Sequence, residues 1–192
     1  YTKLLSKKAD DALRPTVDAI SREIVVMDRI ISDFLTFARP VELNLADIDL
    51  KAIIEYCVMA TARRRDDINL QLDIDNLPLI KGDEVLMRQA FINLIQNSLE
   101  AMPQRGKLII GVSSASGDFL DITVADTGHG ISENVKDKIF LPFFTTKEKG
   151  TGLGLAIVHK IVISHGGSIH VDSSEKGTVF RLRFPSKNAQ TQ

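Results

Sequence analysis

The apolar residues of the first forty positions follow a heptad pattern, which constrains the fold more than any other feature. From Val17 they are spaced by alternating steps of three and four, at Val17, Ile20, Ile24, Met27, Ile31, Phe34 and Ala38. This spacing predicts one helix with a narrow apolar face, with Pro15 in its first turn and an end at Arg39-Pro40. Residues 1–14 resemble the end of an earlier helix that turns back to form an antiparallel hairpin. We expect two hairpins to pair as a dimeric four-helix bundle; an amphipathic hairpin packed on its own domain is the alternative.

After Pro40 the pattern changes to alternating helices and strands. Helical spacing is found at 49–65, 83–102 and 154–165, and alternating or apolar strand patterns are found at 68–74, 107–113, 120–125, 168–173 and 178–184. We expect the apolar face of strand 68–74 to be half-buried. Gly166-Gly167 ends the last helix, and the turn 174–177 joins the final strands as a hairpin. The sequence therefore predicts an α+β fold over residues 41–192, a two-layer α/β sandwich with helices on one face of a mixed sheet, preceded by the hairpin domain at 1–40.

Composition excludes several classes of protein. The chain is 44% hydrophobic and 26% charged, as in globular proteins, and its net charge of −1 gives no reason to expect nucleic-acid binding. The single cysteine, Cys57, excludes an intrachain disulfide and a cysteine-rich zinc site, and we interpret it as a small core residue. No apolar run is long enough to span a bilayer, so we expect membrane attachment only through segments outside this sequence.

Two asparagines stand four residues apart in the predicted helix 83–102. This spacing places Asn93 and Asn97 on the same face. Asparagine is a poor helix former, so two aligned asparagines inside a helix need an explanation. A carboxamide oxygen suits Mg²⁺ and its waters beside a nucleotide's phosphates. A solvated polar face explains the pattern equally well.

The sequence "DTGHG" directly follows the predicted strand 120–125. Asp126 at a strand end can accept a hydrogen bond from an exocyclic amine such as that of adenine. Gly128 and Gly130 remove side chains where a planar base would lie against the backbone. A plain Asp-Gly turn is the alternative interpretation.

The segment "FLPFFTTKEKGTGLGL", residues 140–155, combines phenylalanines, small polar residues and three alternating glycines. Such a segment can fold over a ligand as a lid. Because the glycines stand directly before a predicted helix, Gly152, Gly154 and the first N–H groups of that helix can form an anion site. The spacing matches neither the P-loop nor the dinucleotide-binding fingerprint.

In this order the motifs resemble the N, G1, F and G2 boxes of the sensor histidine kinases of bacterial two-component systems. The resemblance covers the catalytic ATP-binding domain, with its GHKL ATPase-like fold, at about residues 45–185. The preceding sequence "DFLTFARP" resembles the later part of the dimerisation and phosphotransfer domain of the same enzymes.

The resemblance implies a role for each motif. Asn97 would coordinate Mg²⁺, Asn93 would order the phosphates as the other catalytic residue, and Asp126 would hold the adenine amine. Residues from Phe140 to Gly154 would close over the triphosphate as a lid. The residues expected at ATP or ADP are Asn93, Asn97, Asp126, Gly128, Gly130, Ile131, Phe140, Phe144, Thr145, Thr146, Lys147, Gly150, Thr151, Gly152, Leu153, Gly154 and Leu155.

Position 93 separates a kinase from an ATPase within this resemblance. ATPases of the gyrase, Hsp90 and mismatch-repair type carry a glutamate one helical turn before the magnesium asparagine. Here that position is Asn93, which cannot act as a general base. We therefore expect phosphoryl transfer to a histidine and then to an aspartate of a response regulator. The alternatives are a GHKL-type ATP-binding module that is regulatory or hydrolyses ATP, and a protein-serine kinase of the anti-sigma type.

The acceptor histidine of this family lies on the first hairpin helix, but no histidine precedes His129 here. We expect that the chain begins after the acceptor motif and that it binds ATP–Mg²⁺ without phosphorylating itself. The resemblance also implies a homodimer through the hairpin and a cytoplasmic location, with a parent protein that a membrane segment could anchor.

Overall fold

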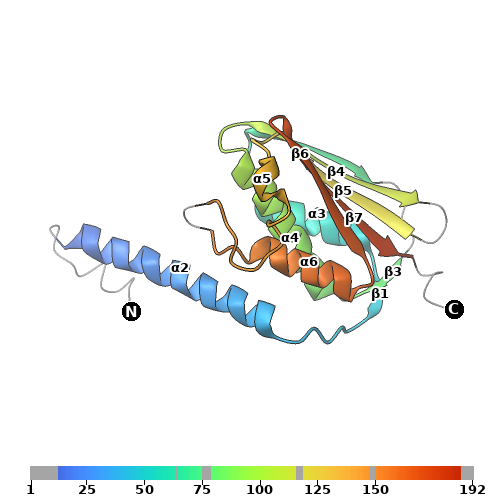
Figure 1. The fold of residues 1–192 in the computed structure, drawn as a ribbon, viewed down its shortest axis with the longest axis horizontal. Helices are drawn as coiled ribbons and strands as arrows, with labels where there is room; N and C mark the ends of the chain where they lie inside the picture. The colour runs from blue at the N-terminus through green and yellow to red at the C-terminus, as the bar shows by residue number, and fades with distance from the viewer. Residues whose placement is uncertain (1–12, 64, 75–78, 116–118, 148–149, 187–192) are drawn as a thin grey trace.

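The computed structural model describes residues 13–63, 65–74, 79–115, 119–147 and 150–186 (Figure 1). The first expected helix, within 1–14, falls almost entirely outside these ranges. The helices are α2 (Arg14–Ala38), α3 (Leu50–Ala62), α4 (Glu84–Ala101), α5 (Glu133–Lys136) and α6 (Gly154–Ser164). The strands are β1 (Ala46–Ile48), β2 (Ile68–Ile74), β3 (Ile80–Gly82), β4 (Gly106–Ala115), β5 (Phe119–Asp126), β6 (Ser168–Ser174) and β7 (Gly177–Pro185).

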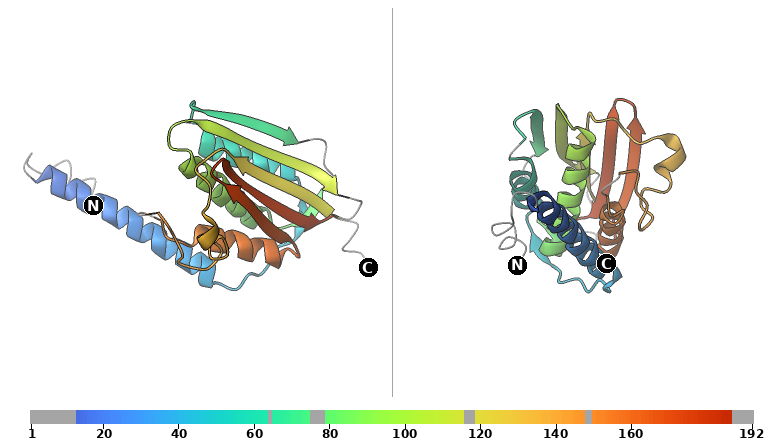
Figure 2. Two further views of the ribbon diagram at one scale, coloured as in Figure 1. Left: turned by 45° about the horizontal axis from the view of Figure 1, so that its top comes forward. Right: turned by 90° about the vertical axis from the view of Figure 1, so that its left-hand side faces the viewer.

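Five strands form one mixed sheet in the order β2-β4-β5-β7-β6. The pair β2–β4 is parallel and the other three pairs are antiparallel, while β1 and β3 form a separate two-stranded ribbon. Helices α3, α4 and α6 lie together on one face of the sheet (Figures 1 and 2). The predicted two-layer α/β sandwich is therefore confirmed.

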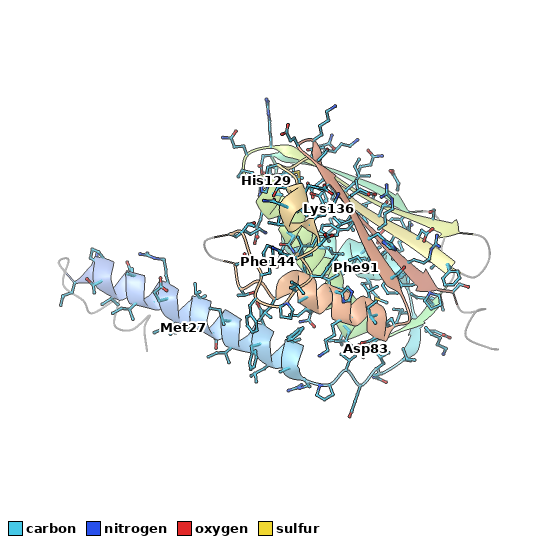
Figure 3. The ribbon with its side chains drawn as sticks, viewed as in Figure 1. Met27, Asp83, Phe91, His129, Lys136 and Phe144 are labelled. Atoms are coloured by element: carbon cyan, nitrogen blue, oxygen red, sulfur yellow. The ribbon has the colours of Figure 1, made fainter. Side chains whose placement is uncertain are left out.

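The core fills the space between this sheet and its helices. Along β5, every second residue is buried, so Leu120, Ile122 and Val124 share the face that meets the helices. From α4, Phe91 (Figure 3) is fully buried in this core, and so is Leu94. Burying a side chain of this size stabilises the fold by about 1.5–3 kcal/mol, so the sandwich is anchored along α4 and β5.

Strand β2 is less buried than its alternation predicts. Ile68 is buried and Ile74 is half-buried, but Leu70 and Leu72 are 38% and 36% exposed. Because β2 is the edge strand of the sheet, its apolar face is only partly covered by the rest of the sandwich. The strand itself is confirmed, and the expected burial holds only at its ends.

The N-terminus of α4 is fixed by residues that are far apart in the sequence. Asp83 is the N-cap, and its Oδ1 accepts hydrogen bonds from the backbone N–H groups of Val85 (3.0 Å) and Leu86 (3.1 Å). The Asp83 N–H in turn donates to Nε2 of the buried His165, at 3.0 Å. His165 Nδ1 lies 2.8 Å from the carbonyl of Ile161, so its ring joins the end of α6 to the start of α4.

The C-terminus of α4 is fixed by an arginine. Arg65 donates hydrogen bonds to the carbonyl oxygens of Leu99 (3.2 Å) and of the C-cap Met102 (2.6 Å), and the Leu99 oxygen also accepts the backbone N–H of Met102. The same guanidinium is oriented by Asp67 through two hydrogen bonds. The helix that carries both asparagines is thus held at each end.

Helix α2 extends away from the sandwich (Figure 1) and ends at Ala38, as its heptad pattern predicts. Its heptad positions are largely exposed: Ile20 by 52%, Ile24 by 47%, Met27 by 62%, Ile31 by 57% and Phe34 by 46%. Within the described ranges, no helix is both long and apolar enough to cross a bilayer.

Candidate functional site

A cavity of about 540 Å³ lies between α4, the end of β5, residues from 139–147 and 150–153, and the start of α6. Phe144 and His129 line it from two different loops (Figure 3). Most residues singled out in the sequence line this one cavity: Asn93, Asn97, Asp126, Gly130, Ile131, Phe144, Thr145, Thr146, Lys147, Gly150, Thr151, Gly152, Gly154 and Leu155. Segments that are distant in the sequence therefore meet at one site.

Both asparagines of α4 face the cavity. Asn93 Nδ2 donates to the carbonyl of Gly154 at 3.4 Å, which ties α4 to the first residue of α6. Asn97 Oδ1 accepts a hydrogen bond from the Lys147 ammonium at 2.9 Å. The amide oxygen of Asn97 is therefore already directed toward a positive charge, as a cation ligand must be.

Asp126 reaches the cavity because of its place in the strand alternation. It follows Leu120, Ile122 and Val124 on the helix-facing side of β5, and it is only 6% exposed. Its Oδ1 accepts hydrogen bonds from the backbone N–H groups of Gly128 (2.9 Å) and Thr178 (3.3 Å). Burial raises the pKa of the Asp126 carboxyl, while these hydrogen bonds oppose the rise.

The two glycines after Asp126 have different surroundings. A Cβ on Gly128 would lie 2.7 Å from the carbonyl oxygen of Ala101, so Gly128 allows the loop to pack against the end of α4. Gly128 does not line the cavity, contrary to the place that the motif suggests for it. Gly130 does line the cavity; its φ is +73° and its Cβ would come within 1.9 Å of the Ser174 carbonyl oxygen.

The lid segment is described over residues 140–147 and 150–155, where two residues have unusual backbone conformations. Gly152 has φ +68°, and a Cβ there would lie 2.5 Å from the backbone of Phe143, which itself has φ +65°. Phe144 lines the cavity, whereas Phe140 packs on the His159 ring with centroids 5.4 Å apart. Leu153 is fully buried in the core. Phe140 and Leu153 therefore support the lid from outside the cavity wall.

Lys147 of the lid contacts α4 directly. Its ammonium bonds to Asn97 Oδ1 and forms an ion pair with Glu100. Among the described residues that line the cavity, it is the only lysine or arginine. The lid thus places one cation at the asparagine end of the cavity.

The cavity also has lining residues to which the motifs assign no contact with a nucleotide. They are Asp33, Gln96, Glu100, Ala101, His129, Ser132, Val135, Ile139, Thr178 and Phe180. Gln96, Glu100 and Ala101 stand three or four residues after one of the asparagines, so helical spacing could have identified them. Asp33 on α2 carries no comparable signal, because only the folded arrangement brings it to the lid.

Comparison with known proteins identifies relatives of the chain. Residues 82–188 match the family of histidine kinase-, DNA gyrase B- and HSP90-like ATPases. The chain is 38% identical over 170 residues to the sensor histidine kinase ZraS of Escherichia coli K12. That alignment covers 86% of this chain and 36% of ZraS, so the chain spans about a third of that relative's length.

Two solved structures have a similar fold. Full-length ShkA in complex with AMPPNP matches 96% of this chain and 41% of its own, with a TM-score of 0.83 and 27% identity. Histidine kinase ThkA in complex with the response regulator protein TrrA matches 98% of this chain and 56% of its own, with a TM-score of 0.78 and 28% identity.

Proposed function

Because the chain belongs to the family of histidine kinase-, DNA gyrase B- and HSP90-like ATPases, we propose that it is the core of a sensor histidine kinase. In this proposal the cavity binds ATP with Mg²⁺ and presents the γ-phosphoryl group to a histidine. The observation that carries the proposal is the convergence of Asn97, Asp126 and the start of α6 on one cavity. The similarity to ZraS and to the nucleotide complex of ShkA supports it.

We assign the buried end of the cavity to the adenine base. The Asp126 carboxylate would accept a hydrogen bond from the exocyclic amine of the base. Its Oδ1 already accepts bonds from Gly128 and Thr178, so the second oxygen, Oδ2, is the better placed acceptor. Ile131 and Phe144 supply apolar surface in the same cavity. A nucleobase needs such a combination of flat apolar walls and one directed polar group.

We assign the opposite end to the polyphosphate and its metal ion. Asn97 Oδ1, which bonds to the Lys147 ammonium, is the kind of oxygen ligand that Mg²⁺ accepts. Lys147 could turn from this oxygen toward a phosphate. Gly154 starts α6 between the two asparagines: a Cβ there would lie 3.8 Å from Asn97 Nδ2 and 3.9 Å from Asn93 Oδ1. The open backbone and the helix N-terminus suit a phosphate group, and bound Mg²⁺ would neutralise its charge.

The chemistry of position 93 favours transfer over hydrolysis. Asn93 lies in the cavity and donates to the Gly154 carbonyl, so it positions α6 and cannot take a proton from water. The phosphoryl group would therefore wait for a protein acceptor. No histidine precedes His129, so we propose that the acceptor is a histidine outside this sequence. The phosphoryl group would then pass from that histidine to an aspartate of a response regulator. The structure of ThkA, which resembles this chain, was solved in complex with a response regulator protein.

The remaining parts of the proposal concern assembly and location. The exposed heptad face of α2 would pair with a second copy, because an apolar helix face of this regularity is typical of helical bundles. A site that uses ATP would operate in the cytoplasm. Any membrane attachment would come from segments outside this sequence.

Calorimetric titration with ATP tests the nucleotide site. We expect Mg²⁺-dependent binding of ATP that weakens by about tenfold or more in Asn97→Ala, since a metal ligand is lost. Adenosine binding should survive this change. Asn69→Ala, on the exposed edge strand β2, is the matched control. Equal ATP affinity in Asn97→Ala and in the unchanged chain would contradict the assignment of the metal.

Incubation with γ-labelled ATP tests the reaction. We expect the chain to retain intact ATP and to carry no acid-labile, base-stable label. Rapid release of ADP would instead support the ATPase alternative. A phosphohistidine on this chain would show that one of its four histidines is an acceptor.

A further inference from the structure

The ammonium of Lys147 lies between two oxygen-bearing side chains of α4. It bonds to Asn97 Oδ1 at 2.9 Å and forms an ion pair with Glu100. Asn97 and Glu100 stand three residues apart, so helical spacing places a carboxamide oxygen and a carboxylate oxygen on the same face of α4. Both are hard oxygen ligands of the kind that Mg²⁺ accepts. The ammonium therefore lies at a position that suits a cation.

The backbone of Lys147 is held in a turn of the lid. Its N–H donates to Thr145 Oγ1 at 3.1 Å, and its carbonyl accepts the N–H of Gly150 at 3.2 Å. A Cβ on Gly150 would lie 2.4 Å from Thr145 Oγ1, so this turn is tightly packed. The ammonium, in contrast, is at the end of a flexible four-carbon side chain. It can therefore leave Asn97 and Glu100 by side-chain rotation while the turn stays in place.

The charges at this end of the cavity oppose an anion that arrives without a cation. Glu100 lines the cavity, and Lys147 is the only lysine or arginine among the described lining residues. If the ammonium turned toward a phosphate, the Glu100 carboxylate would lose the ion pair that it now forms and would face the same phosphate. Like charges at such short range repel each other. A second cation beside Glu100 would remove this repulsion.

We propose that Glu100 is a further residue of the metal site, and that Lys147 gives up its position to the metal ion when a nucleotide binds. This inference rests on the proposed nucleotide site, in which Asn97 was the residue assigned to Mg²⁺. Asn97 and Glu100 then hold a divalent cation in place of the ammonium, and Lys147 contacts the phosphates. Because Glu100 repels a phosphate that arrives alone, this exchange makes the binding of the polyphosphate depend on the metal ion.

Glu100→Gln separates the attraction of a metal ion from the repulsion of a phosphate. Glutamine keeps the length of the side chain but removes its charge. We expect the affinity for ATP with Mg²⁺ to fall by about tenfold, as when other partners of a metal ion are lost. The affinity for ATP in the presence of EDTA should instead rise by about threefold, the size expected for one partly exposed charge. Adenosine affinity should stay constant. Calorimetric titration of the whole chain measures all three affinities.

Glu84→Gln is the matched control. Glu84 lies on the same helix and also pairs with a basic residue, Arg88. It is about 24 Å from Glu100 along the helix axis, beyond the range over which exposed charges interact at physiological salt. This variant should therefore change none of the three affinities.

Binding of Mn²⁺ without a nucleotide tests the exchange itself. Mn²⁺ accepts the same oxygen ligands as Mg²⁺, and the EPR signal of the free ion reports how much is bound. Lys147→Met removes the ammonium, so Mn²⁺ should bind about threefold more tightly than to the unchanged chain. The double variant Lys147→Met/Glu100→Gln should lose this gain, because the ion would then lack the carboxylate. No gain in Lys147→Met, or a gain that persists in the double variant, would overturn the exchange.

The outcomes separate this inference from the proposed function. If the unchanged chain binds ATP with Mg²⁺ and Glu100→Gln binds it with equal or higher affinity, the role of Glu100 is wrong and the nucleotide site stands. An equal loss in Glu84→Gln, or an unchanged affinity of Glu100→Gln for ATP in EDTA, would likewise overturn it. If neither adenosine nor ATP binds to the unchanged chain or to any variant, the nucleotide site itself is wrong, and the inference falls with it.

Discussion

Replacement of Asp126 by asparagine should change stability and binding in opposite directions. Asp126 is 6% exposed, and its burial raises the pKa of the carboxyl above the ordinary aspartate value. In an acid whose folded-state pKa is raised, the folded state binds protons more tightly than the unfolded state. The free energy of unfolding therefore falls as pH rises from the unfolded pKa through the folded pKa.

Asp126→Asn removes this loss without removing the backbone contacts. The amide Oδ1 can still accept from Gly128 and Thr178, which both bond to the carboxylate Oδ1. At pH 7 we expect stabilisation of about 1 kcal/mol, in the range of substitutions that relieve strained functional sites, or roughly 2–4 °C in Tm. The pH-dependent part of this difference should vanish well below pH 4, where aspartate is protonated in both states.

The same change should strongly weaken the binding of adenine nucleotides. With Oδ1 held by the two backbone N–H groups, the new amide NH₂ faces the cavity, where it would meet the amine of the base donor to donor. The flipped amide would instead direct its NH₂ at the N–H groups of Gly128 and Thr178. Either arrangement costs about 3 kcal/mol, or a roughly 150-fold loss of affinity.

Thermal unfolding and nucleotide titration of the same preparations provide the assay. The matched control is Asp121→Asn on the same strand, whose carboxyl pKa is lowered chiefly by its hydrogen bonds from Arg183. This control should lose at most about 1 kcal/mol at pH 7 and should bind ATP normally. The reasoning is refuted if Asp126→Asn keeps its affinity for ATP, or if it is less stable than the unchanged chain at pH 7 while its fold is intact.

Two further predictions concern the supports of the site and the helix α2. Asp83→Ala removes the N-cap of α4 and should lower the free energy of unfolding by about 1–2 kcal/mol in chemical denaturation; Asp49→Ala, at the N-cap of α3 with one capping bond, should cost less. Ile24→Asn/Ile31→Asn on the exposed face of α2 should convert a dimer into a monomer in light scattering, whereas Val85→Asn, exposed on α4, should not. An unchanged mass for the double variant would contradict pairing through this face.

Local patterns predicted the elements of the sandwich because each pattern reflects a local cause. Asp83 and Met102, the expected ends of the long helix, are its N-cap and C-cap. The ribbon strands β1 and β3 and the short helix α5 were not predicted. They have three or four residues each, too few for a periodicity to be distinguished, and tertiary contacts determine them.

The site was predictable where the strand or helix period fixes the direction of a side chain. Asp126 continues the buried alternation of β5, and Asn93 and Asn97 lie one helical turn apart. Gly128 shows the limit of the motif: it was expected to leave room for a base, but the room is taken by Ala101. Asp33 could not be found at all, because it lies 118 residues from Thr151 and only the docking of α2 joins them.

The supports of the cavity differ on its two sides, and this difference limits where regulation can act. Helix α4 is held by Asp83 and His165 at one end and by Arg65 at the other, so the wall that carries Asn97 is tied to the core. The lid rests on the core through Phe140 and Leu153, and its cavity side is joined to α4 through Lys147 and to α2 through Thr151. A movement of α2 therefore acts on the lid before it can act on Asn97 or on the base end of the cavity. Regulation through α2 should change how the phosphates are held while leaving the recognition of adenine unchanged.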